Sequence, residues 1–145
     1  MIKINLKKLN KNAVIPTRGS VSSAGYDLYA CLESSIKIRP GETVKVPTGI
    51  AIEIPEGYVG LIFARSGLSI KKNIAPANKV GVCDSDYRGE YIVALKNDGT
   101  NEYIVKNGDR IAQLVIVPFL AVEFKEVESL TETKRGENGF GSTGV

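Results

Sequence analysis

The chain has 145 residues, of which 43% are hydrophobic and 24% are charged, values typical of a single soluble globular domain. Its net charge of +3, from 19 basic and 16 acidic residues, is too small to indicate a nucleic-acid partner. The chain contains no histidine, which excludes Ser-His-Asp and Cys-His catalysis and argues against a zinc site.

The chain shows no sign of secretion or of membrane insertion. Residues 2–7 alternate apolar and polar side chains, which predicts a strand rather than a secretory signal. No apolar run approaches the ~20 residues of a membrane-spanning helix. Two cysteines, Cys31 and Cys83, are too few for a disulfide framework, so we expect buried free thiols and a cytoplasmic location.

Short strands are predicted along most of the chain, after a loop at 16–20. They cover residues 24–30, 35–39, 43–54 with a break at 47–49, 59–64, 80–83, 91–94, 102–105, 110–118 and 121–127. Only residues 66–72 favour a helix, of about two turns, because Asn73 and Pro76 stop it. Short strands separated by glycine and proline predict an all-β sandwich or barrel with one short helix.

Residues 80–94 are predicted to form a β-hairpin whose tip runs from Asp84 to Gly89. This tip carries Asp84, Asp86 and Tyr87. Taken alone, the two carboxylates could simply cap their own backbone in a solvated turn. Alternatively, one of them acts on a reacting group beside the aromatic face of the tyrosine.

A second candidate site lies where a strand ends at Ala64 and the helix begins at Ser66. The first turn of a helix has unsatisfied backbone N–H groups and a partial positive charge. With Arg65 beside it and Gly67 allowing close approach, this helix start can bind phosphate. The alternative is an ordinary N-cap serine at position 66.

Two further polar residues occur within predicted strands. Gln113 lies among apolar neighbours, and a buried amide needs hydrogen-bond partners. It is either a structural amide bonded to a neighbouring strand or a donor to a ligand. Asp27 is either a turn-stabilising acid or an acid that holds the water shell of a metal ion.

The carboxyl end, residues 131–145, forms a glycine-rich arm outside the predicted β domain of residues 1–130. Such dense glycine disfavours strand and helix, and alone it predicts a disordered tail. However, Phe140 between two glycines can lie flat on a planar partner, and the Ser142 and Thr143 hydroxyls can donate to an anion. These features predict a lid, and the combined inventory suits a nucleoside polyphosphate with Mg²⁺.

Five stretches together resemble the five motifs of the trimeric dUTP pyrophosphatases (dUTPases), in the order of that family: residues 24–30, 65–69, 81–90, 108–115 and 135–144. The resemblance covers essentially the whole chain. It implies a jelly-roll-like β fold and a homotrimer with three active sites at subunit interfaces. It also implies hydrolysis of dUTP to dUMP and pyrophosphate, which keeps uracil out of DNA and supplies dUMP for thymidylate synthesis.

The resemblance also implies roles for single residues. Asp84 matches the acid that orients and deprotonates a water for in-line attack on the α-phosphorus, and Tyr87 matches the ring under the deoxyribose. Asn78, Gly81 and Val82 match the edge that reads uracil, and Asp27 matches the acid that contacts Mg²⁺ through water. The matched phosphate-binding and lid residues are Arg65, Ser66, Gly67, Gln113, Arg135, Phe140, Gly141, Ser142 and Thr143.

Two positions depart from the motifs: Cys83, where a bulkier aliphatic residue is common, and Asn138, which replaces a frequent glycine. Neither matches a contact residue, although Cys83 is expected to make the site sensitive to thiol reagents. Two other functions are considered. A dCTP deaminase of the same fold class lacks the glycine-rich lid found here at 135–144. A nucleotide-sensing module that binds a protein partner would use the same motifs.

Overall fold

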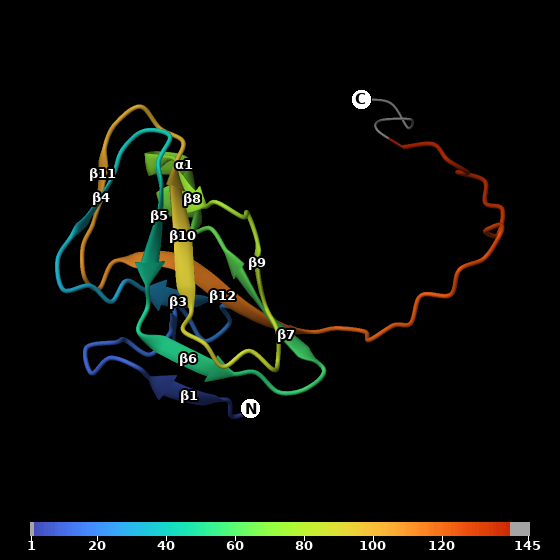
Figure 1. Ribbon diagram of the computed structural model, residues 1–145, viewed down its shortest axis with the longest axis horizontal. Helices are drawn as coiled ribbons and strands as arrows, with labels where there is room; N and C mark the ends of the chain where they lie inside the picture. Colours follow the sequence, from blue (N-terminus) through green and yellow to red (C-terminus); the bar gives the residue numbers. More distant parts are fainter. Residues whose placement is uncertain (1, 140–145) are drawn as a thin grey trace.

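The computed structural model describes residues 2–139, so the predictions made for Phe140, Gly141, Ser142 and Thr143 lie outside the described residues. Figure 1 shows one short helix and a set of short strands. The elements are β1 (Asn5–Lys8), β2 (Thr17–Arg18), β3 (Tyr26–Tyr29), β4 (Ile36–Ile38), β5 (Thr43–Pro47), β6 (Ile50–Glu53), β7 (Tyr58–Phe63), α1 (Ser66–Lys72), β8 (Ile74–Pro76), β9 (Gly81–Cys83), β10 (Ile92–Asn97), β11 (Tyr103–Val105) and β12 (Arg110–Pro118).

The strands form antiparallel sheets that enclose one core. The largest has five strands in the order β2-β3-β12-β7-β9, and a second has the order β5-β10-β8. Two-stranded pairs β1-β6 and β4-β11 complete the arrangement. This is the predicted all-β, jelly-roll-like class with a single short helix in the described chain. No helix among residues 2–139 is long and apolar enough to cross a membrane.

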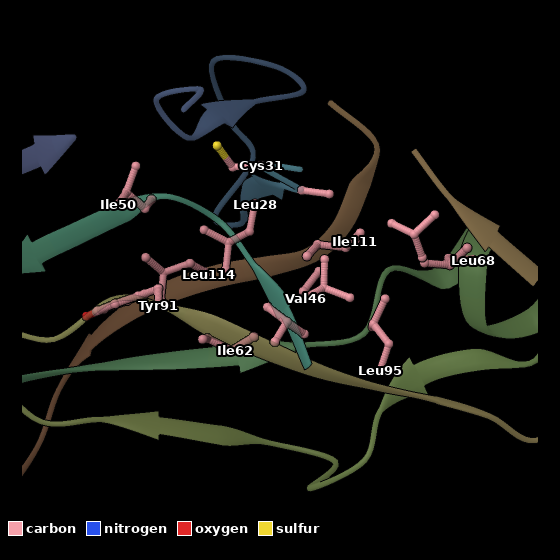
Figure 2. Close-up of a cluster of buried hydrophobic side chains, with 14 of the residues drawn as sticks. Leu28, Cys31, Val46, Ile50, Ile62, Leu68, Tyr91, Leu95, Ile111 and Leu114 are labelled. Carbon is pink, nitrogen blue, oxygen red and sulfur yellow. The ribbon is translucent and has the colours of Figure 1, made fainter. Parts of the chain in front are cut away.

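The core lies between the sheets because alternate side chains of each strand point to one face. Along β10, Val93, Leu95 and Asn97 are buried and alternate with more exposed neighbours. Figure 2 shows Leu28, Ile62 and Leu114 of the large sheet packed in one apolar cluster with side chains from β5, β6 and β10. This cluster holds the large sheet in a fixed position and so supports the site residues that it carries.

The helix agrees with its prediction at both ends. Asn73 adopts a left-handed conformation with φ of 55°, and its backbone N–H donates to Ser69 O at 3.0 Å. Asparagine tolerates this conformation better than most residues and therefore ends the helix. At its other end, the helix starts shortly after β7, so its first turn lies at the end of a strand in the large sheet.

The prediction of a β-hairpin over 80–94 is wrong in its pairing, although the turn at its tip is present. The Tyr87 N–H donates to Asp84 O at 3.2 Å, as in a tight turn. However, β9 pairs with β7 in the large sheet, whereas β10 pairs with β5 and β8. Alternating apolar residues show that two segments are strands but do not identify their partners, which are chosen by the core.

The predicted strand at 121–127 is also absent. The chain from Phe119 to Asn138 leaves the body of the molecule without strand or helix (Figure 1). Its large apolar residues are exposed: Phe119, Leu120, Val122, Phe124, Val127 and Leu130. The alternation is real, but a strand also needs a neighbour to bond its backbone. Smaller differences are a two-residue strand, β2, inside the predicted loop, and a first strand that begins at Asn5.

Candidate active site

The residues predicted to bind the base and sugar lie together around one hollow of about 270 Å³. This base-side hollow is formed by β9, the turn that follows it and the start of β10. Its lining includes the five residues outside the arm that were predicted for uracil, deoxyribose and catalysis: Asn78, Gly81, Val82, Asp84 and Tyr87. The sequence motif therefore corresponds to a single place in the fold, although its two strands enter different sheets.

β9 is suited to read a flat ligand because it is an edge strand of the five-stranded sheet. Gly81 and Cys83 lie opposite Ile62 and Gly60 of β7, and the other side of β9 has no strand partner in the described chain. An edge strand presents unpaired backbone N–H and C=O groups. A Cβ added at Gly81 would lie 3.3 Å from the Ile62 Cβ and 3.4 Å from Asn78 Nδ2, so glycine keeps this corner open.

The Tyr87 ring is held in place by a hydrogen bond and by a neighbouring aromatic ring. Its hydroxyl donates to Glu90 O at 2.9 Å, and its centroid lies 6.0 Å from that of Tyr91. The ring covers Gly89, where an added Cβ would come within 2.4 Å of the Tyr87 hydroxyl oxygen. With 44% of the residue still exposed, Tyr87 offers a fixed aromatic surface at the mouth of the base-side hollow.

Beside Asp84 lie two side chains whose pKa values are raised, the Cys83 thiol and the Tyr91 hydroxyl. Burial raises the pKa of the Cys83 thiol; the Tyr91 hydroxyl beside it opposes this rise, and the nearby Asp84 carboxylate adds to it. Burial, and then Cys83, raise the pKa of Tyr91 as well. The Tyr91 hydroxyl is buried and has no hydrogen-bond partner among residues 2–139, so its contact with the Cys83 thiol is not a hydrogen bond. Asp84 itself is exposed at the turn.

A second group of site residues lies in the middle of the large sheet, and we call it the arginine cluster: Asp27, Arg65 and Arg110. The Asp27 carboxylate accepts a hydrogen bond from Arg65 Nε at 2.7 Å and another from Arg110 Nη1 at 3.3 Å. Asp27 lies within β3, so its interpretation as a turn-stabilising acid is wrong. Arg110 was not among the predicted site residues, although it lies within the matched stretch 108–115.

Gln113 lies on β12 directly opposite Asp27 and anchors the strand that leads to the helix. Its Nε2 donates to Ala64 O at 2.9 Å, which confirms the structural interpretation of this amide. A Cβ added at Gly25 would come 2.4 Å from Gln113 Oε1, so only glycine leaves room for the side chain here. A role of Gln113 as ligand donor remains a prediction.

The helix start is open to a ligand. The N-cap residue is Arg65, with an extended backbone and no side-chain capping bond, so the interpretation of Ser66 as an N-cap serine is wrong. Ser66 and Gly67 are both exposed, and a Cβ added at Gly67 would meet nothing within 4 Å. No acidic residue lies in the first turn, which leaves the positive end of the helix uncompensated there.

The base-side hollow and the arginine cluster are separate within one chain, because the hollow's lining contains none of Asp27, Arg65 and Arg110. Arg135, the one predicted arm contact inside the described residues, is exposed, and its Nε donates to Asn138 O at 2.9 Å. The structure thus assembles two halves of the predicted site and does not join them.

The described residues contain no cluster of three or more His, Cys, Asp or Glu side chains that could hold a metal ion by themselves. Both Asp27 oxygens already accept hydrogen bonds from arginines. This donor set offers no direct ligand cage, so a divalent ion here would be held mainly by substrate oxygens and water, and contact with Asp27 through a water molecule remains a prediction.

Comparisons with known proteins agree in pointing to one family. A family model described as dUTPase matches residues 11–144. A deoxyuridine 5'-triphosphate nucleotidohydrolase of Desulfitobacterium hafniense is 50% identical, over 99% of this chain and 96% of the relative. One of Anaplasma marginale is 45% identical over the full length of both chains.

Solved structures give the same result. The Staphylococcus bacteriophage 80alpha dUTPase with dUPNHPP superimposes with a TM-score of 0.92 at 34% identity, over all of both chains. The dUTPase of phage phi11 of S. aureus gives a TM-score of 0.83 at 30% identity, over 91% of this chain and all of that one. The chain therefore belongs to the dUTPase family.

Proposed function

We infer that this chain is a dUTP diphosphatase, which hydrolyses dUTP to dUMP and pyrophosphate. Its activity keeps uracil out of DNA and supplies dUMP for thymidylate synthesis. The observation that carries this conclusion is the hollow at β9, where Asn78, Gly81, Val82, Asp84 and Tyr87 of a dUTPase-family chain meet. No covalent nucleophile is required for this reaction, in agreement with a chain that lacks histidine.

We propose that the free edge of β9 reads the base. Backbone donors and acceptors around Gly81 and Val82, together with the Asn78 amide, offer uracil a donor and an acceptor in fixed positions. Cytosine carries the opposite donor and acceptor at the corresponding edge, so it would leave buried groups unpaired and be rejected. The Tyr87 ring, held over Gly89, supports the deoxyribose and leaves no space for a 2′-hydroxyl.

In the proposed chemical step, Asp84 orients a water molecule and accepts its proton during in-line attack on the α-phosphorus. The exposed carboxylate at the rim of the hollow can reach both solvent and a bound nucleotide. Enzymes of this family use a divalent metal ion, and we propose Mg²⁺. When bound, it neutralises phosphate charge; the protein contributes mainly by positioning the reacting groups.

The phosphates are proposed to bind at the helix start. Arg65 donates its Nε to Asp27, which orients its guanidinium and leaves both terminal amino groups free for a phosphate. The exposed Ser66 and Gly67 offer backbone N–H groups there. Gln113 supports this junction through its bond to Ala64 O, and Asp27 contacts the metal through water.

A homotrimer with shared active sites accounts for two features of the single chain. The base-side hollow and the arginine cluster do not meet, so a second copy can supply the missing half of each site. An apolar groove of about 610 Å³ is also open on the body; its lining includes Ile4, Leu6, Tyr26, Ile52, Tyr58 and Ile116. The exposed apolar residues of 119–130 match this groove in chemistry, and we propose that another copy's segment covers it.

The arm, residues 131–145, is proposed to close over an active site, with Arg135 on the γ-phosphate, Phe140 over uracil, and Gly141, Ser142 and Thr143 near the phosphates. Deleting 135–145 should reduce turnover by about 100-fold or more, because closure excludes water and completes the phosphate contacts. Sedimentation velocity should show an unchanged trimer. Dissociation into monomers would instead assign the arm a structural role.

The decisive experiment measures pyrophosphate release from dUTP, dCTP, dTTP and UTP, with and without Mg²⁺, alongside a sizing measurement. We expect release from dUTP alone, stimulated by Mg²⁺, from a particle of three chains. Ammonia release from dCTP would instead identify a deaminase. Absence of pyrophosphate release from dUTP would refute the proposed function. The free thiols Cys31 and Cys83 support the further proposal of a cytoplasmic location.

A second candidate function is nucleotide-dependent binding of a protein partner. It is favoured by the similarity to the phage 80alpha dUTPase, because phage dUTPases are described as controlling the transfer of virulence genes by a proto-oncogenic G protein-like mechanism. We propose to test this with pull-downs repeated with and without dUpNHpp. A partner retained only in one nucleotide state would support a sensing role in addition to hydrolysis.

A further inference from the structure

Arg110 reaches the phosphate half of the site because β12 contains an irregularity. The pairing of β12 with β3 shifts by one residue between Arg110 and Ala112: Gln113 lies opposite Asp27, but Arg110 lies opposite Tyr29. In a regular strand, residues three apart point to opposite faces. The extra residue of a β-bulge changes this, so Ile111 and Ala112 are both buried and Arg110 returns to the face of Gln113 and Asp27.

The bulge places two guanidinium groups on one carboxylate. Asp27, whose side chain is 15% exposed, uses one oxygen for Arg65 and the other for Arg110. Arg110 spends only one terminal amino group on this contact, which leaves its Nε–H and its second amino group free. Its side chain is 53% exposed, against 26% for Arg65, so these donors face solvent. The arginine cluster therefore carries one net positive charge.

Pairing with Asp27 does not by itself account for Arg110. Asp27 already has a shorter, more buried ion pair with Arg65, at 2.7 Å. The contact with Arg110 is longer, at 3.3 Å, and its guanidinium is half exposed, a setting in which an ion pair stabilises a fold little. An accessible planar cation beside a second one is, however, well suited to bind a polyphosphate.

We propose that Arg110 is a further phosphate-binding residue, which donates to the triphosphate from the same carboxylate support as Arg65. This inference rests on the proposed function, because it assumes that nucleotide phosphates bind beside Arg65. In this proposal Asp27 holds the guanidinium groups of Arg65 and Arg110 side by side, and the bulge in β12 sets their spacing. The bulge in β12 is thus part of the binding site.

The test is Arg110→Gln, which removes the charge and keeps a side chain of similar length. Titration calorimetry compares dUpNHpp, dUMP and deoxyuridine on the full-length protein. We expect the affinity for dUpNHpp to fall about tenfold or more, as for the loss of one charge-assisted hydrogen bond, with no change for deoxyuridine. Arg39→Gln, at an exposed position between β4 and β5, is the control for charge and should leave all three affinities unchanged.

Three outcomes would overturn the inference: unchanged affinity for dUpNHpp, an equal loss for deoxyuridine, or an equal loss in Arg39→Gln. If Arg110→Gln does not fold, Arg110→Lys replaces it; this variant keeps the charge but not the planar fork, and we expect a smaller loss confined to dUpNHpp. Failure of the proposed function is distinguishable, because it would appear as absence of dUTP hydrolysis by the unmodified chain.

Discussion

The two halves of the candidate site, the base-side hollow and the arginine cluster, differ in the chemical groups that form them. The base-side hollow consists of an edge strand, a glycine and mostly uncharged side chains, among them a thiol and a phenol whose pKa values are raised by burial, and its only charged lining residues in the described chain are the acids Asp84 and Glu90. The arginine cluster consists of three charged side chains on strands and a strand end of the large sheet. A rigid backbone edge can discriminate between bases by hydrogen-bond pattern, whereas guanidinium groups recognise charge. The two halves should therefore respond differently to mutation and to salt.

The largest expected effect tests whether the hollow also carries the chemistry. Asp84→Asn should lower turnover by about 10²–10⁴-fold, the usual contribution of a general base, while dUpNHpp affinity changes little. Asp86→Asn is the matched control, because Asp86 belongs to the same turn but does not line the hollow. Steady-state kinetics and calorimetry measure the two quantities. An unchanged rate for Asp84→Asn would remove it from the role of base.

A second variant tests discrimination by the aromatic surface. Tyr87→Ala should raise kcat/KM for UTP relative to dUTP by about tenfold, because removing the ring opens space beside the sugar. Tyr87→Phe keeps the ring and loses only the bond to Glu90 O, so it should retain most of the preference for dUTP. If the ratio is the same in the alanine variant as in the unmodified protein, another group excludes the 2′-hydroxyl.

A third variant separates ligand contact from folding on the phosphate side. Gly67→Ala introduces a methyl group that meets nothing in the protein and favours the helix by about 0.5–1 kcal/mol. We expect a slightly higher melting temperature together with a several-fold weaker affinity for dUpNHpp, but not for deoxyuridine. Gly19→Ala, where the nearest atom would be 3.8 Å away, is the control. Unchanged dUpNHpp affinity would indicate that phosphates do not approach this helix start.

The smallest effect concerns only the reactivity of Cys83. Burial raises its pKa, and the thiolate is the nucleophile, so maleimide should label it more slowly than an exposed thiol at pH 7. The rate should rise about tenfold per pH unit until the pH reaches this raised pKa. Bound dUpNHpp should slow labelling because Cys83 lines the hollow. Peptide mapping separates Cys83 from the buried Cys31, and equal labelling with and without nucleotide would contradict this location.

Much of the candidate site could be predicted because its residues are close in sequence. Asn78 to Tyr87 lie within one short segment, and this segment folds around one hollow. Predictions failed where the outcome depended on distant partners. The strands that flank the turn enter different sheets, and the alternating segment 121–127 finds no partner within its own described chain.

The amino-acid sequence by itself determined the helix 66–72, the tight turn that begins at Asp84 and most strand positions, because capping, turn chemistry and side-chain alternation act over a few residues. Only the tertiary structure decided that β9 is an edge strand beside β7, and that a bulge brings Arg110 to Asp27. Strand partners and register depend on how distant apolar faces pack into one core, and that packing is not encoded in any single segment.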